Sequence, residues 1–329
     1  MKITVIDSGY DSYAYEKQLF EDNGFEFEVS LKQRHDQANK APIATGSVGI
    51  LLRWTQVDEA FLRQLPDLKA IVRYGVGYDN IDIIAAKRHG VRVANVQSYA
   101  NHAVSDHALA LVLSGARLLP LRQNSLGRDF GKAPAPDVME LADKTLGIIG
   151  LGRIGGTLCQ KAHPLFKRIL ATDPYVPPER FDQLGALPCD LRTLLSEADV
   201  ISIHCDLTNE TCNLIDGNAF SLMAKRPIIV NTARGQIINP AALLDAINND
   251  TIHSVGVDVY SEEPPSDDTV PLLSHPRVIA TGHYAWYSTR SSVTLQKRAG
   301  ENLLGLLSDA EVEDELTKQP NKPHGTMRG

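Results

Sequence analysis

The chain has 329 residues, of which 43% are hydrophobic, and a formal net charge of −7 at pH 7. This length is sufficient for about two domains with separate cores, and the hydrophobic content is typical of a globular protein. The negative charge, together with the absence of a concentrated run of Lys and Arg, argues against a general binder of nucleic acid.

The sequence shows no secretory or membrane-spanning signal. The N-terminal segment reaches Asp7 after a short strand-like run, so it lacks the apolar core of a signal peptide. The longest apolar run, at 108–121, contains Arg117 and is too short to span a bilayer.

The cysteines give no indication of metal binding or disulfide formation. They are Cys159, Cys189, Cys205 and Cys212. They have neither CxxC spacing nor a neighbouring cluster of histidines, so neither chemistry is predicted. A reduced, cytoplasmic compartment is the simplest expectation, with no metal site.

The first hundred residues alternate between predicted strands and helices. Strands are expected at 2–9, 48–54, 68–75 and 91–96, and helices at 10–23 and 58–65. Because such alternation implies parallel pairing with helices on both faces, residues 1 to about 98 are predicted to form a small α/β domain.

The remaining segments continue this pattern after a long helix. The helix is expected at 102–119, followed by a proline-broken connection at 132–137. Later strands are expected at 200–205, 227–233, 254–259 and 277–283, then a helix at 289–307 and a loose tail at 321–329. The short, β-branched, nearly continuous strands are typical of a parallel sheet covered on both faces.

A glycine-rich motif lies between these parts of the chain. The segment LGIIG reads as a buried strand and runs into GLGRIG, which places Gly150, Gly152 and Gly155 at GxGxxG spacing. The first glycine permits a tight turn, the second admits a pyrophosphate, and the third allows close helix–strand packing. This motif predicts a dinucleotide site.

The residues that follow the glycines strengthen this interpretation. Arg153 and Ile154 open a helix whose N-terminal amides point towards a phosphate. The next strand, RILATD, ends at Asp173, 18 residues after the last glycine, where a carboxylate can accept the ribose hydroxyls. Since this carboxylate would repel a 2′-phosphate and PYVPP offers no cation, NAD is expected in preference to NADP.

Three residues at the ends of late strands suggest hydride-transfer chemistry. Arg234 follows the strand at 227–233, Glu263 lies in the loop after 254–259, and His283 ends the last strand. Histidine, with an ordinary pKa of about 6.5, can take and return the hydroxyl proton of a 2-hydroxy acid. A neighbouring carboxylate favours imidazolium, and the arginine fork suits a substrate carboxylate.

Each of these residues also has a simpler interpretation. Glu263 could be a solvated charge of the acidic loop, Arg234 a surface cation, and His283 a core histidine or cap. Asp258 could be a helix cap or a contact of the nicotinamide. Glu262 lies beside Glu263 and is the alternative partner for His283.

These segments resemble the D-isomer-specific 2-hydroxyacid dehydrogenases. NTARG (231–235), VDVYSEEP (257–264) and GHYAWY (282–287) are similar to the Arg, Glu and His signatures of that family, in the same order. The resemblance implies that Arg234 binds and activates the substrate, that Glu263 partners His283, and that His283 is the acid/base. Gly282 departs from the family pattern, in which a proline is common.

The first domain contributes to the resemblance, which is strongest for the branch that includes the C-terminal-binding-protein corepressors. RYGVGYDNID (73–82) is similar to the family loop whose amides take the substrate carboxylate. The implied substrate-binding residues are Arg73, Gly75, Val76, Gly77 and Trp286. The implied cofactor contacts, beyond the glycine motif and Asp173, are Val76, Cys205, Thr208, Thr211, Thr232, Ala233 and Asp258. Trp286 could instead be a packing aromatic between domains.

The family pattern implies a fold, a function and an assembly. The expected fold is α/β, with a doubly wound, Rossmann-type NAD domain at 99–288 and a smaller flavodoxin-like substrate domain formed by 1–98 and 289–329. The expected function is NAD-dependent hydride transfer between a small D-2-hydroxy acid and its 2-keto acid. The alternative is an NAD(H)-sensing corepressor or scaffold.

A homodimer is expected through the helix at 102–119 and the arm after it. Leu118, Leu119 and Leu121 of this arm would be a costly apolar exposure in a monomer. The substrate-binding and hydride-donating groups belong to different domains, which are therefore expected to close over the substrate.

Overall fold

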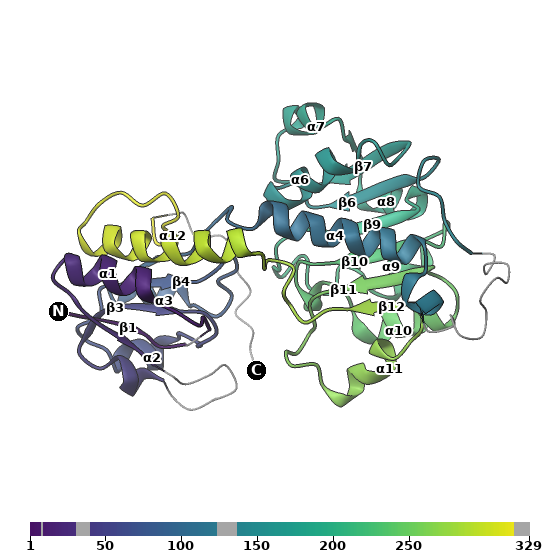
Figure 1. Ribbon diagram of the computed structural model, residues 1–329. Coiled ribbons are helices and arrows are strands. Elements are labelled where there is room, and N and C mark those ends of the chain that lie inside the picture. Colours follow the sequence, from purple (N-terminus) through teal and green to yellow (C-terminus); the bar gives the residue numbers. More distant parts are fainter. Residues whose placement is uncertain (8, 31–39, 124–136, 319–329) are drawn as a thin grey trace. The chain divides into compact units, whose positions relative to one another are not determined.

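The computed structural model describes residues 1–7, 9–30, 40–123 and 137–318. The chain divides into two compact units, of which unit 1 comprises Met1–Ala100 and Ser288–Gly329 and unit 2 comprises Asn101–Tyr287 (Figure 1). The predicted connection at 132–137, apart from its last residue, and the predicted tail at 321–329 lie outside the described residues.

Unit 1 is built on a five-stranded parallel sheet in the order β2-β1-β3-β4-β5. Its strands are β1 (Lys2–Val5), β2 (Glu26–Val29), β3 (Ser47–Leu52), β4 (Ala70–Arg73) and β5 (Arg92–Ala94). Its helices are α1 (Ala14–Asp22), the 3-10 helix η1 (Ala41–Ala44), α2 (Glu59–Arg63), α3 (Ile83–Arg88) and α12 (Thr289–Leu307).

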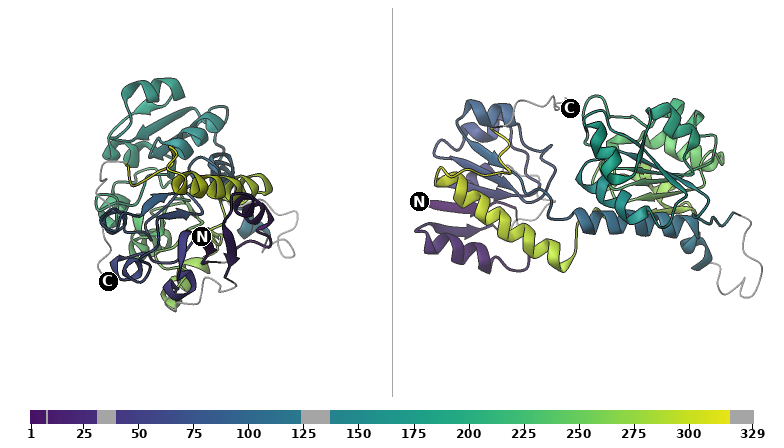
Figure 2. Two further views of the ribbon diagram at one scale, coloured as in Figure 1. Left: turned by 90° about the vertical axis from the view of Figure 1, so that its left-hand side faces the viewer. Right: turned by 90° about the horizontal axis from the view of Figure 1, so that it is seen from above.

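Helices cover both faces of this sheet. The last helix, α12, packs against β3, β4 and β5 and lies beside α1, far from it in sequence (Figures 1 and 2). Leu303 of α12 lies close to Gly49, whereas the neighbouring Ile50 packs with residues of α2 and α3. Because successive strand residues point to opposite faces, the two helix pairs cover opposite sides of the sheet.

Unit 2 is built on a seven-stranded parallel sheet in the order β12-β11-β10-β9-β6-β7-β8. Its strands are β6 (Thr145–Ile149), β7 (Arg168–Thr172), β8 (Leu187–Pro188), β9 (Val200–Ile203), β10 (Ile228–Asn231), β11 (Ser254–Val257) and β12 (Val278–Ala280). Its helices are α4 (Asn101–Ala116), α6 (Arg153–Ala162), α7 (Pro178–Leu184), α8 (Leu191–Glu197), α9 (Gly217–Ser221), α10 (Pro240–Asn248) and α11 (Val270–Leu273). Unit 2 also has two 3-10 helices, η2 (Gly235–Ile237) and η3 (Asp267–Thr269).

Two core clusters lie on the two faces of this sheet. One joins α4, α6 and α7 to the sheet through residues such as Leu111, Leu158 and Phe181. The other joins α8, α9 and α10 through residues such as Leu194 and Phe220. Figure 2 shows the long α4 lying along the sheet. The predicted doubly wound α/β fold is therefore confirmed.

The structure also corrects several predicted elements. The strand β2 was not predicted, because Glu26–Val29 alternates charged and apolar residues at an edge of the sheet and remains half exposed. The short helix α3 was also missed. The helix predicted at 102–119 ends at Ala116, since Leu118 adopts a left-handed backbone with φ 49°. The helix predicted at 289–307 is confirmed as α12, which a Ser288/Ser291 capping box begins.

The described ranges contain neither a helix suited to span a membrane nor a cluster of metal ligands. Within them, no helix is both long and apolar enough to cross a membrane. Over the same ranges, no group of three or more His, Cys, Asp or Glu side chains could hold a metal ion. All four cysteines are free.

Candidate active site

The loop after β10 is held in shape by a buried asparagine. The Asn231 side chain is 1% exposed; its Oδ1 accepts the Ala233 N–H at 3.0 Å and its Nδ2 donates to the Arg234 carbonyl at 2.9 Å. Two such bonds from one rigid side chain fix the backbone from which the Arg234 side chain projects. The Arg234 guanidinium is partly buried and donates from Nη1 to the Ala233 carbonyl at 2.8 Å.

The loops after β10 and β11 lie in direct contact at Gly235. A Cβ atom at this position would lie 2.0 Å from the carbonyl carbon of Tyr260, far inside van der Waals contact. The Tyr260 N–H in turn donates to Glu263 Oε1 at 3.3 Å. Only glycine allows the loop that carries Arg234 to pack this closely against the loop that carries Glu263.

His283 and Glu263 form a short hydrogen-bonded pair. The distance between His283 Nδ1 and Glu263 Oε2 is 2.6 Å, and the two side chains are 32% and 18% exposed. Because a carboxylate only accepts, Nδ1 carries the hydrogen and Nε2 is left to exchange a proton with another group. Glu262, the alternative partner, is exposed, and the observed partner is Glu263.

Asp258 holds the turn from which His283 projects. Its carbonyl accepts the His283 N–H at 2.8 Å, and its carboxylate accepts the N–H groups of Tyr284 at 3.1 Å and Ala285 at 2.9 Å. His283 itself has φ 55°, in the left-handed region that a non-glycine residue rarely adopts. Asp258 thus anchors the turn, while its contact with nicotinamide stays a prediction.

The glycine loop after β6 has the geometry that a dinucleotide requires. Gly150 has φ 91°, and a Cβ there would lie 2.5 Å from the Cys205 nitrogen. A Cβ at Gly155 would lie 2.0 Å from the Gly150 oxygen, whereas nothing lies within 4 Å of the corresponding position at Gly152. Space is therefore left open at the N-terminus of α6, where Arg153 and Ile154 begin the helix.

Asp173 follows β7 and faces the same loop. Its Oδ2 accepts the Leu151 N–H at 2.8 Å and its Oδ1 accepts the Tyr175 N–H at 3.0 Å. Each carboxylate oxygen can accept a further bond. The carboxylate is therefore fixed in place with capacity to bind ribose hydroxyls.

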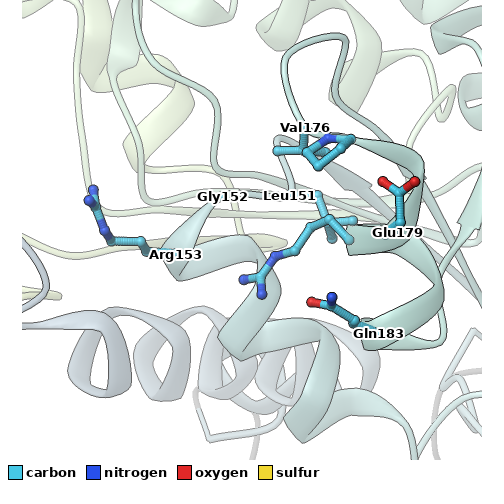
Figure 3. A pocket seen from close by; sticks show the side chains of 8 residues that line it. Leu151, Gly152, Arg153, Val176, Glu179 and Gln183 are labelled. Atoms are coloured by element: carbon cyan, nitrogen blue, oxygen red, sulfur yellow. The ribbon is translucent and has the colours of Figure 1, made fainter.

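A cavity of about 390 Å³ lies between the glycine loop and α7, within the range of small-molecule sites. It is lined by Leu151, Gly152, Arg153, Val176, Pro177, Glu179, Arg180 and Gln183. In Figure 3 the Arg153 side chain extends away from Val176, Glu179 and Gln183. The cavity adjoins the segment that follows Asp173, as an adenosine site would.

The other predicted cofactor contacts lie at the ends of β9 and β10. In the loop after β9, the Thr208 N–H donates to Thr211 Oγ1 at 2.7 Å, which bridges on to the Asp206 carbonyl at 2.6 Å. Burial raises the pKa of the Cys205 thiol to about 12, so this thiol stays protonated. The Thr232 hydroxyl is buried without a hydrogen-bond partner in the described part of the chain, as expected of a group that awaits a ligand. These residues fit a dinucleotide.

The predicted substrate residues lie in both units. In unit 1, Gly75 has φ 131°, and a Cβ there would lie 1.8 Å from Arg73 Nη1, so the two are in close contact. The Val76 carbonyl accepts from Asn95 Nδ2 at 2.6 Å, which fixes the loop that continues to Gly77. In unit 2, the Trp286 indole N–H donates to the His283 carbonyl at 3.2 Å.

Sequence reasoning missed several residues that shape this site. Asn231 and Tyr260 lie inside the quoted motifs NTARG and VDVYSEEP, but their roles depend on hydrogen bonds that spacing does not reveal. Thr281 and His107, which lie behind the turn at His283, carried no sequence signal at all.

Comparisons with known proteins agree with this geometry. Residues 109–285 match the D-isomer specific 2-hydroxyacid dehydrogenase, NAD binding domain. The chain is 33% identical over 92% of its length to D-3-phosphoglycerate dehydrogenase of Archaeoglobus fulgidus, of which it covers 57%. It is 33% identical over 89% of its length to glyoxylate/hydroxypyruvate reductase B of Serratia proteamaculans, of which it covers 90%.

A solved structure shares the fold over nearly all of the chain. The apo-structure of D-lactate dehydrogenase from Escherichia coli has a TM-score of 0.79, with 31% identity over 96% of this chain and all of that one. The chain spans about half the length of the phosphoglycerate dehydrogenases that it matches.

The fold and the glycine loop define an NAD-binding protein of the Rossmann type. The chain belongs to the D-isomer-specific 2-hydroxyacid dehydrogenases, a family of oxidoreductases, and NAD is its cofactor. The finer resemblance to the corepressor branch stays a prediction.

Proposed function

We propose that the protein is an NAD-dependent D-2-hydroxyacid dehydrogenase that interconverts a small D-2-hydroxy acid and its 2-keto acid. The observation that carries this proposal is the 2.6 Å pair between His283 Nδ1 and Glu263 Oε2, beside the loop of Arg234. A histidine oriented by a carboxylate is a standard device for moving a proton. In the balanced reaction, keto acid, NADH and a proton give hydroxy acid and NAD⁺.

His283, Glu263 and Arg234, the trio of this site, have different roles in the proposed reaction. Bound NADH would supply the hydride. His283 holds a proton on Nε2, gives it to the keto oxygen during reduction, and takes it back during oxidation. Glu263 keeps the imidazole in orientation through Nδ1 and stabilises its positive charge. Arg234 binds the substrate carboxylate and stabilises the negative charge that develops on the carbonyl oxygen.

We propose NAD(H) contacts at the residues that the sequence indicated. They are Val76, Gly150, Gly152, Arg153, Ile154, Gly155, Asp173, Cys205, Thr208, Thr211, Thr232, Ala233 and Asp258. The Asp173 carboxylate would repel a 2′-phosphate, so kcat/KM should be higher with NADH than with NADPH. Arg153 and Arg180 line the neighbouring cavity, and an arginine there would favour a 2′-phosphate rather than repel it. The expected preference for NADH therefore depends on the charge of Asp173. Equal kcat/KM values for the two cofactors would contradict this assignment.

We propose that unit 1 is the substrate domain and unit 2 the NAD domain. Arg73 and the backbone amides of Gly75, Val76 and Gly77 would bind the substrate carboxylate, and Trp286 would line the substrate pocket. Arg73→Ala should then raise KM for the keto acid at least tenfold and leave the Kd of NADH nearly unchanged. An equal effect on both constants would place Arg73 outside the substrate site.

The alternative function is an NAD(H)-sensing scaffold without turnover, and it is less favoured. A scaffold has no need for a histidine paired at hydrogen-bonding distance with a carboxylate. The two functions are separated by following NADH oxidation with a panel of 2-keto acids that differ in side chain. Turnover with at least one acid supports the dehydrogenase. Stoichiometric NADH binding without turnover on any of them would favour the scaffold.

A further inference from the structure

His107 lies behind the turn that carries His283 and belongs to none of the assigned groups. It lies on α4, which packs against β10, β11 and β12. Its imidazole is 19% exposed, and its Nε2 lies 3.0 Å from the Thr281 hydroxyl and 3.8 Å from Asp258 Oδ1. Its ring also meets the Tyr284 ring edge to face, with centroids 5.4 Å apart.

The direction of the hydrogen bonds between these groups follows from their chemistry. The Thr281 hydroxyl lies 2.5 Å from Asp258 Oδ1 and 3.4 Å from the Val257 carbonyl. Its one hydrogen goes to the nearer, charged acceptor, since charge-assisted bonds are stronger. The Thr281 oxygen is then an acceptor, so His107 must donate to it from Nε2. This fixes the orientation of the hydroxyl and the position of the hydrogen on the imidazole.

The same Asp258 carboxylate also receives the N–H groups of Tyr284 and Ala285. A chain of hydrogen bonds therefore runs from His107 through Thr281 to Asp258 and into the turn at His283. A second hydrogen bond holds Thr281, the residue that follows β12: the Tyr260 hydroxyl donates to the Thr281 carbonyl at 2.7 Å. Burial, with the Asp258 charge second, raises the pKa of Tyr260 to about 12, so the phenol keeps its hydrogen.

The turn needs such support because of its backbone. His283 has φ 55°, a left-handed conformation that is unfavourable for a residue with a side chain and persists only where the surroundings enforce it. The His107 N–H polarises the Thr281 hydroxyl and so strengthens its bond to Asp258, because hydrogen bonds in a chain reinforce one another. Without the His107 donor this bond is weaker, and the turn is held less firmly. The turn can then relax and carry the His283 imidazole away from its partner.

We propose that His107 is a positioning residue that holds His283 in its working orientation through Thr281 and Asp258. The proposal rests on the proposed function, because it presumes that His283 transfers the proton. The proposal gives α4 a part in the site, although none of the predicted site residues lies on that helix. The printed polar and ring contacts of His107 are with Thr281, Asp258 and Tyr284, and they do not include the side chains of the proposed reacting groups.

The test compares two substitutions of His107. His107→Gln can keep an N–H donor directed at Thr281, whereas His107→Leu fills similar space without a donor. We expect His107→Leu to lower kcat roughly 10- to 100-fold, the scale of a small misplacement of a catalytic group, with the Kd of NADH changed less than about twofold. We expect His107→Gln to restore most of kcat. His102→Leu, at an exposed position on the same helix, is the matched control.

A second readout does not depend on turnover. The imidazole ¹⁵N resonances of His283, assigned by their loss in His283→Asn, should move in His107→Leu and return towards the wild-type positions in His107→Gln. Unchanged resonances and kcat in His107→Leu would overturn the proposal, as would equal losses in both variants. A wild-type protein that reduces no 2-keto acid, but shows the expected resonance shifts, would refute the proposed function and leave the positioning contact supported.

Discussion

At the scale of single residues, the environment of a side chain determines the chemistry available to it. His283 and His204 both lie just beyond the carboxyl ends of strands, yet their surroundings differ. His283 pairs with a carboxylate and is 32% exposed. His204 has the Ser202 hydroxyl at 2.8 Å, and burial lowers its pKa from 6.5 to about 4. His204 is therefore neutral at neutral pH and unsuited to give up a proton.

The lowered pKa of His204 predicts a loss of stability in acid. Between pH 6.5 and 4 the unfolded chain binds a proton at this residue and the folded chain does not, so unfolding becomes more favourable as pH falls. This effect on the free energy of unfolding is absent well above pH 6.5. At pH 5 it lowers the free energy of unfolding by about 2 kcal/mol. Urea-unfolding midpoints should therefore fall more between pH 7.5 and pH 5 in the wild type than in His204→Gln. An equal fall in both proteins would show that folding does not lower the pKa of His204.

The charged residues of the candidate site were easier to predict from the sequence than the residues that hold them in place. Arg234, Glu263 and His283 could be named because strand ends of one parallel sheet converge. The family resemblance favoured Glu263 over Glu262, whereas spacing alone did not separate two acids one residue apart in the same loop; the observed hydrogen bond is to Glu263. The role of Thr281 could not be predicted, because it depends on the course of a turn with a left-handed residue.

At the scale of elements, close contact between two loops brings the site together. The loops after β10 and β11 meet at Gly235, where the backbone of Tyr260 occupies the space of a side chain. Most strands and their parallel pairing were predictable from apolar runs and βα alternation, but no strand order was predicted. The edge strand β2 was not, because its alternating charged residues give a weak apolar signal.

This loop contact gives a prediction about Gly235→Ala. The added methyl group would lie 2.0 Å from the Tyr260 carbonyl carbon, so one of the loops must move. We expect a stability loss of about 1 to 3 kcal/mol and a fall in kcat of at least tenfold, measured by thermal unfolding and by steady-state kinetics. Gly217→Ala is the control, since nothing lies within 4 Å of its added Cβ. Equal behaviour of the two variants would contradict the account of this contact.

At the scale of the whole molecule, two α/β units divide the predicted functions. Unit 1 contains Arg73 and the loop that follows it, and unit 2 contains the glycine loop and the trio. The return of the chain to unit 1 through α12 was implied by the family pattern. Periodicity alone could not predict it, because an amphipathic helix does not specify the sheet that it covers.

We expect a homodimer that uses α4 and the residues after it. Leu113 and Leu119 are 40% and 53% exposed, whereas Leu118, which was expected to be exposed, is 4% exposed and packs within its own chain. An interface that covers the two exposed leucines would remove apolar surface from water. Sedimentation equilibrium at micromolar concentration should give twice the chain mass of 36.0 kDa. A single species of 36.0 kDa would remove this expectation.

In the proposed reaction His283, oriented by Glu263, transfers the proton to the 2-keto acid. The most direct test is kcat of His283→Ala with the best 2-keto acid, measured beside the Kd of NADH from fluorescence titration. We expect kcat to fall on the order of 10² to 10⁴-fold, the usual contribution of a positioned acid/base, with NADH binding preserved. A His283→Ala protein that turns over at the wild-type rate would show that His283 is not the proton donor.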